Sequence, residues 1–237
     1  MVTIVDSLQA IQATIVAAKL SAKRTDAVHL LAVSKAQSAD KLRAAYLAGQ
    51  RAFGENYVQE AINKQTELHD LAIKWHFIGP IQSNKTALIA QHFDWVHSVD
   101  RLKIAQRLND ARPANMPLLN VCIQINSSDE GSKSGVDIGL QSMLAKAIIA
   151  MPRLKLRGVM SIPAPTQDFS KQRAQFKIVA DAYKNLRQEF EPELNMDTLS
   201  IGMSDDYVAA IQEGATMVRI GSALFGLRTL KIKNENA

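Results

Sequence analysis

Short apolar runs alternate with helical patterns along the whole chain, and this alternation limits the folds that the sequence can adopt. The apolar runs predict eight strands, at 28–35, 51–56, 74–79, 95–100, 118–126, 156–163, 198–204 and 217–226. Between them, apolar residues recur at helical spacing at 41–48, 58–69, 85–91, 101–111, 140–150, 171–190 and 206–213. A further amphipathic helix is predicted near the N-terminus, with Val5, Leu8, Ile11 and Ile15 on one face.

Strands that alternate with helices predict a parallel sheet, because each helix returns the chain to the start of the next strand. The chain has 237 residues and no linker rich in Pro, Gly or Ser. Eight strand–helix units in this length favour a single (β/α)8 barrel, the TIM barrel, over residues 1–237. An open, doubly wound α/β sheet is the alternative.

Composition excludes several classes of protein. The net charge is +5 and the pI is near 9.3, but no run of five basic residues occurs and aromatic residues are few, which argues against nucleic-acid binding. Cys122 is the single cysteine, so the chain has no intrachain disulfide framework. No apolar stretch is as long as a membrane span, and the N-terminus lacks the basic segment of a secretory signal. We expect a cytoplasmic monomer with no membrane and no nucleic acid among its partners.

Lys35 ends the first predicted strand, in the sequence LLAVSK at 30–35. A helix is predicted directly after it, with Ser38 or Asp40 as the cap and Gly49 as the stop. Desolvation at the end of a buried strand lowers the pKa of a lysine and makes its amine a nucleophile towards carbonyl groups. The alternative is a lysine that extends to solvent.

Small and polar residues follow the last two predicted strands. The sequence GMSDD at 202–206 precedes a helical pattern, and Gly221 and Ser222 follow the eighth strand. Barrels often bind phosphate between these two loops, through backbone N–H groups and hydroxyls. Alternatively, Ser204, Asp205 and Asp206 are helix caps and the glycines are turn residues.

Arg219 lies within the eighth predicted strand, where a buried guanidinium requires partners. Alternation along the strand places Arg219 on the same face as Gly221. An ion pair with Glu55 or Asp100 is one explanation, and a ligand is the other.

A lysine amine, a phosphate-binding loop and an arginine at one end of a barrel favour a ligand with both a carbonyl and a phosphate. Pyridoxal 5′-phosphate (PLP) meets this requirement, and so does a sugar phosphate. PLP forms a Schiff base with a lysine. Arg219 has no site to accept a proton, so it would leave the pyridine ring neutral and a weak electron sink.

Seven motifs together resemble the YggS/PROSC family of PLP homeostasis proteins. They are LLAVSK at 30–35, FGENYVQE at 53–60, WHFIGPIQSNK at 75–85, SSDEGSKSG at 127–135, LRGVMSIP at 156–163, LSIGMSDDY at 199–207 and VRIGSALFG at 218–226. The resemblance implies a fold-type III PLP barrel, similar to the N-terminal domain of alanine racemase, without the second domain of the racemases.

The resemblance also implies roles for individual residues. Lys35 would be the Schiff-base lysine that binds PLP covalently, Asn56 would lie near the ring and Arg219 would face the pyridine nitrogen. Met160 would lie near the ring face. Phosphate contacts would come from Ser204, Gly221 and Ser222, and Met203 would be a further cofactor-binding residue. Family members commonly have Thr in place of Ser222. No catalytic residue and no metal ligand is assigned.

The function implied by the resemblance is PLP homeostasis, in which the protein holds PLP and supplies it, with PLP-dependent apo-enzymes as partners. One alternative is a racemase-like enzyme, which is disfavoured because the second domain and its opposed tyrosine are missing, although Tyr57 lies near. Another is a Schiff-base aldolase acting on sugar phosphates. We expect His76 to be a core histidine and Lys133 to be solvated.

Overall fold

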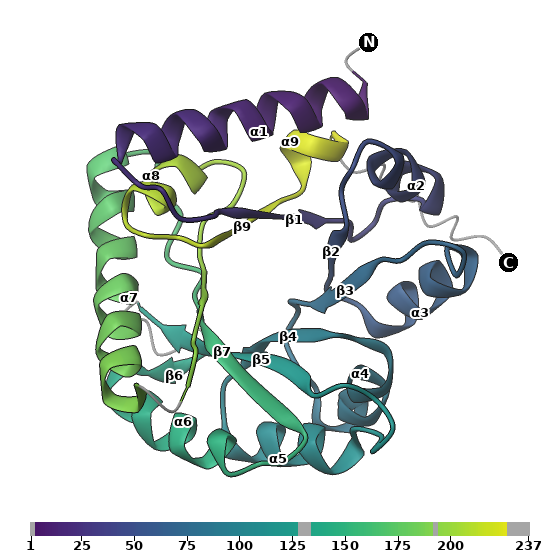
Figure 1. Cartoon of the computed structure of the whole chain (residues 1–237), viewed down its shortest axis with the longest axis vertical. Helices are drawn as coiled ribbons and strands as arrows, with labels where there is room; N and C mark the ends of the chain where they lie inside the picture. The colour runs from purple at the N-terminus through teal and green to yellow at the C-terminus, as the bar shows by residue number, and fades with distance from the viewer. Residues whose placement is uncertain (1–2, 128–133, 192–193, 227–237) are drawn as a thin grey trace, which may run out of the picture.

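The computed structural model describes residues 3–127, 134–191 and 194–226, and within them the strands form a closed parallel barrel (Figure 1). Each strand of the ring pairs in parallel with the ring strand that follows it along the chain, and the last strand pairs with the first, which closes the ring. The alternative of an open doubly wound sheet is therefore wrong. The described strands of the barrel are β1 (His29–Val33), β2 (Ala52–Glu55), β3 (Lys74–Phe77), β4 (Trp95–Val99), β5 (Leu119–Asn126), β7 (Leu154–Met160), β8 (Thr198–Ser200) and β9 (Met217–Ile220).

Helices surround this barrel and bury the apolar outer face of its sheet. In the described part of the chain they are α1 (Ile4–Ser21), α2 (Ala39–Leu47), α3 (Val58–Glu67), α4 (Thr86–His92), α5 (Leu102–Ala111), α6 (Gln141–Ile149), α7 (Phe169–Phe190), α8 (Tyr207–Gln212) and α9 (Ser222–Phe225), with short 3₁₀ turns η1 (Ser83–Lys85) and η2 (Ile138–Leu140). The predicted N-terminal helix is confirmed as α1, which packs on α2, α8 and α9 (Figure 1).

Several predicted strands extend too far at their carboxyl ends. The predicted strands 156–163, 198–204 and 217–226 end in the structure at Met160, Ser200 and Ile220. The prediction of a strand at 217–226 is wrong beyond Ile220, because Ser222–Phe225 form helix α9. The short strand β6 (Val136–Asp137), which lies beside β5, was not predicted.

The start of α2 matches its prediction more closely. Ser38 is the N-cap residue, although its side chain makes no capping hydrogen bond, and Asp40 lies in the first turn. Gly49 follows the helix with a φ of 104°, a conformation that favours glycine.

The core has two separate apolar clusters. The larger one lies between the sheet and the helices, and the smaller one consists of Trp95, Cys122 and Met160. Cys122 is fully buried there. Every helix within the described ranges is too short or too polar to span a lipid bilayer.

Candidate functional site

Lys35 follows β1 at the carboxyl end of the barrel, in a turn where it is half-buried. The Ser34 N–H donates to Gly54 O of β2 over 2.9 Å, so the two strand ends lie together. On the other side, a Cβ at Gly221 would lie 3.1 Å from Val33 O. The turn that holds Lys35 is therefore fixed between the loops after β2 and β9.

A buried network of ion pairs and hydrogen bonds stabilises this turn. Lys64 Nζ of α3 donates to Ser34 O over 2.7 Å, to Glu55 Oε1 over 2.8 Å and to Glu60 Oε1 over 2.6 Å. Glu60 Oε1 also accepts from the Ala36 N–H over 2.6 Å. Since Ser34 and Ala36 flank the lysine in sequence, the network fixes the backbone on both sides of it.

Burying the two charges of this network costs desolvation free energy, so loss of either partner would leave an unpaired buried charge. The Glu55 side chain is fully buried and that of Lys64 is nearly so. Burial raises the pKa of Glu55, while Lys64 and the Ser34 hydroxyl act in the opposite direction. Ala36 has a φ of 59°, which L-residues rarely adopt. The sequence does not predict this role of Lys64, because a lysine on a short helix is usually solvated.

Arg219 is buried inside the barrel on β9, and its hydrogen-bond partners are neutral groups. Nη1 donates to Ser200 O over 2.5 Å and to Ser200 Oγ over 3.0 Å, and Nη2 donates to Ser161 O over 3.0 Å. The suggested ion pairs are wrong, because Glu55 pairs with Lys64 and Asp100 pairs with Arg101.

Burial lowers the pKa of Arg219 to about 10, partly opposed by Asp206 and by the Cys122 thiol. The guanidinium therefore stays charged at neutral pH. Within the described residues it has no carboxylate at ion-pair distance, which leaves a buried cation facing the site.

Asn56 presents a second unsatisfied group at the same end of the barrel. Its Oδ1 is buried and has no hydrogen-bond partner among the described residues. Gly79 of the next loop packs so closely that a Cβ there would lie 2.4 Å from Asn56 O. Buried polar atoms nearly always have a partner, so this atom is positioned to meet a ligand.

The loop after β8 is shaped by a glycine and by a carboxylate. Gly202 has a φ of 89°, and its O accepts from the Arg219 N–H over 3.0 Å. The Met203 N–H donates to Asp206 Oδ1 over 2.6 Å. Asp206 is the N-cap residue of α8, but its carboxylate makes no capping bond to that helix.

The two serines expected at a phosphate lie in the segments that follow β8 and β9. Ser204 is half-buried after β8, and Ser222 is exposed at the first position of α9. Neither hydroxyl has a hydrogen-bond partner in the part of the chain that the structure describes. Met203, in the loop after β8, is 37% exposed.

Two of the remaining residues named from the sequence, Met160 and His76, are buried inside the barrel. Met160 is fully buried against Trp95 and Cys122, inside the barrel. His76 is a core histidine, as expected, and is bonded to His97. Lys133 lies outside the described residues. In the described ranges, no three His, Cys, Asp or Glu side chains are grouped as metal ligands.

Known proteins resemble the chain over nearly its whole length. The family model for the N-terminal domain of alanine racemase matches residues 7–229. The pyridoxal phosphate homeostasis protein of Pseudomonas aeruginosa is 55% identical, over 96% of this chain and 97% of its own. The protein of that name from Escherichia coli K12 is 51% identical, over 90% and 91%.

Solved structures agree with this relationship. PipY of Synechococcus elongatus with PLP bound is 36% identical, with a TM-score of 0.80 over 94% of this chain and all of PipY. Alanine racemase of Corynebacterium glutamicum is 20% identical and shares the fold, with a TM-score of 0.68. The match covers 93% of this chain but 62% of the racemase.

The network of Lys64, Glu55 and Glu60 beside the Lys35 turn leads to a prediction about stability. Lys64→Met should lower the free energy of unfolding by about 3–5 kcal/mol, because it leaves the buried Glu55 carboxylate without its cation. Denaturant unfolding followed by circular dichroism measures this change.

Lys184→Met on the exposed surface of α7 is the matched control and should change stability little. Adding Glu55→Gln to Lys64→Met should recover part of the loss, since both buried charges are then removed. Equal stability of the Lys64→Met and Lys184→Met proteins would show that the network does not hold the turn.

Proposed function

The chain belongs to the family of pyridoxal phosphate homeostasis proteins, and we propose that it binds PLP covalently through Lys35 and buffers or supplies this cofactor. The observation that carries the proposal is the buried Arg219 guanidinium, which faces neutral partners at the same barrel end as Lys35. PipY, whose structure was solved with PLP bound, supports the choice of ligand.

The residues present fit PLP group by group. The Lys35 amine would bond to the aldehyde carbon, and Asn56 Oδ1, which lacks a partner among the described residues, lies one strand away from it. The Ser204 and Ser222 hydroxyls, which have no partner among the described residues, would donate to the phosphate, with Met203 and Gly221 in the same two loops. Met160 would support the ring from inside the barrel.

Arg219 favours storage of the cofactor over catalysis. PLP, when bound, supplies a ring that withdraws electrons strongly only when its nitrogen is protonated. Arg219 is a donor without an acceptor site, so it cannot hold that proton on the ring. We therefore propose a protein without catalytic turnover of its own.

We propose that residues 1–237 form one PLP-binding domain, within which the family model matches residues 7–229. Tyr57, the tyrosine next to Asn56, is 62% exposed. The proposed setting is a cytoplasmic monomer that exchanges PLP with PLP-dependent apo-enzymes.

The covalent link predicts a yellow protein. Borohydride treatment of the PLP-loaded protein should bleach the visible band and fix the mass of the reduced cofactor on Lys35, because reduction makes the bond permanent. Peptide mass spectrometry locates this mass.

Lys35→Ala should carry no such mass, whereas Lys146→Ala, an exposed lysine on α6, should be labelled like the parent. A label on any lysine other than Lys35 would contradict the assignment.

The two serines predict a difference between PLP and pyridoxal. Ser204→Ala combined with Ser222→Ala should weaken PLP binding, since each hydrogen bond to an anion is worth roughly 1.5–3 kcal/mol. Binding of unphosphorylated pyridoxal should change little. Titrations with both ligands compare these losses, and equal weakening of the two would place the phosphate elsewhere.

The absence of turnover is tested by exchange of the α-proton. Several L- and D-amino acids, incubated with PLP-loaded protein in deuterated water, should exchange no faster than with free PLP. Proton NMR measures the rate. Exchange at about 1 per second or faster that disappears in Lys35→Ala would favour the racemase-like alternative.

A further inference from the structure

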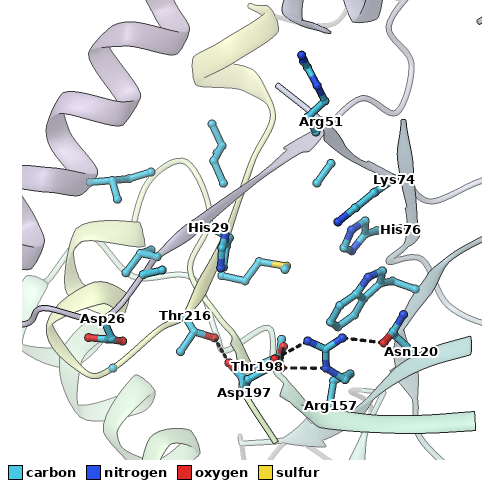
Figure 2. Close-up of a pocket in the computed structure, with 18 of the residues that line it drawn as sticks. Asp26, His29, Arg51, Lys74, His76, Asn120, Arg157, Asp197, Thr198 and Thr216 are labelled. Carbon is cyan, nitrogen blue, oxygen red and sulfur yellow. Dashed lines mark hydrogen bonds and ion pairs between the residues drawn. The ribbon is translucent and has the colours of Figure 1, made fainter. Parts of the chain in front are cut away.

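A cavity of about 1380 Å³ opens at the amino-terminal end of the barrel (Figure 2). Its wall includes the first residues of six barrel strands, which are His29, Ala52, Lys74, Trp95, Thr198 and Met217. The Lys35 turn follows the carboxyl end of β1, so this cavity lies at the opposite end of the barrel from the site proposed for PLP.

The cavity carries an excess of positive charge. Five Arg and Lys side chains line it, against three carboxylates. Arg24 pairs with Asp26, and Arg157 pairs with Asp197. Lys74 is exposed and has no carboxylate at ion-pair distance in the described part of the chain. The remaining carboxylate, Asp94, accepts from a backbone N–H over 2.8 Å.

His76 forms part of the same wall. It is 2% exposed, and its ring is stacked on Trp95 with centroids 5.2 Å apart and an interplanar angle of 9°. Its Nδ1 lies 2.9 Å from His97 Nε2. Its Nε2 has no partner among the described residues. Figure 2 shows Lys74 lying beside His76 in the cavity wall.

A series of hydrogen bonds determines whether Nε2 of His76 is a hydrogen-bond donor or an acceptor. Arg219 Nη1, which is always a donor, donates to Ser200 Oγ over 3.0 Å. The Ser200 hydroxyl then donates its own hydrogen to His97 Nδ1, 3.0 Å away. The reverse direction would leave that hydrogen without an acceptor among the described residues.

The series of hydrogen bonds continues from His97 to His76 in the cavity wall. With Nδ1 of His97 as an acceptor, its Nε2–H donates to Nδ1 of His76. The Nε2 of His76 therefore carries a hydrogen and is a donor. Burial lowers the pKa of His97 well below its ordinary value and that of His76 to about 3, and the charges of Lys74 and Arg157 lower the latter further. Both rings stay neutral, so the direction of the chain is kept.

We propose that this cavity binds the oxyanion of a small molecule, a phosphate or a carboxylate group. The His76 Nε2–H would donate to an oxygen of the anion, and Lys74 would supply the opposite charge. Charge-assisted hydrogen bonds of this kind are the strong ones in proteins. His29, exposed on β1 and also in the wall, completes the polar surroundings.

The proposed site can be tested independently of PLP. The Ser204→Ala, Ser222→Ala protein, labelled with ¹⁵N in its histidine rings, removes the hydroxyls expected to hold phosphate at the other end. Inorganic phosphate and acetate are titrated separately against chloride at constant ionic strength. We expect a saturable shift of the His76 Nε2–H signal with phosphate, and a weaker response with acetate.

Lys74→Met in the same background should weaken this binding about tenfold or more, the equivalent of one lost charge-assisted contact. Lys155→Met is the matched control, because it removes an exposed cation near the start of β7 that does not line the cavity. A stronger response to acetate would assign the site to a carboxylate. No saturable shift with either anion, or equal weakening by both substitutions, would overturn the proposal.

Discussion

The pairing of β4 with β5 closes the sheet, and the arrangement of the molecule depends on this closure. Because every strand of the ring is parallel, all carboxyl ends meet at one end of the barrel and all amino ends at the other. Lys35 and Asn56 are brought together at the first end, and His29 and Lys74 at the second. In sequence these pairs are separated by at least one helix, and the parallel pairing of β1 with β2 and of β2 with β3 brings them together at the two ends.

The closed barrel also has to accommodate Arg219. A buried guanidinium requires hydrogen-bond acceptors, and Ser161 O and Ser200 O supply them. Strands β7 and β8 end at Met160 and Ser200, beside these carbonyl groups. The predicted strands ran past this point, because apolar runs report burial and do not report where a carbonyl group leaves the sheet to accept from a side chain.

The sequence predicted the barrel and most strand positions, since alternation of apolar runs and helices survives small errors at their ends. It also identified Lys35 and Arg219 as unusual for their positions. It missed Lys64 and the pairing of His76 with His97. Lys64 reaches Glu55 from α3 to β2, and the two histidines meet through neighbouring strands inside the barrel. Such contacts depend on packing in three dimensions, which periodicity does not encode.

The distribution of buried charge connects these observations to function. At the carboxyl end the buried carboxylate Glu55 is neutralised by Lys64, and the buried cation Arg219 is not paired with any carboxylate of the described residues. The charge that remains for a ligand is therefore positive, and it lies on a group that only donates hydrogen bonds. We propose that such a site holds an anionic cofactor firmly but offers its ring no proton acceptor. The same arginine also donates to Ser200 Oγ, which contacts His97, so it starts the series of hydrogen bonds that we propose to reach the cavity at the opposite end.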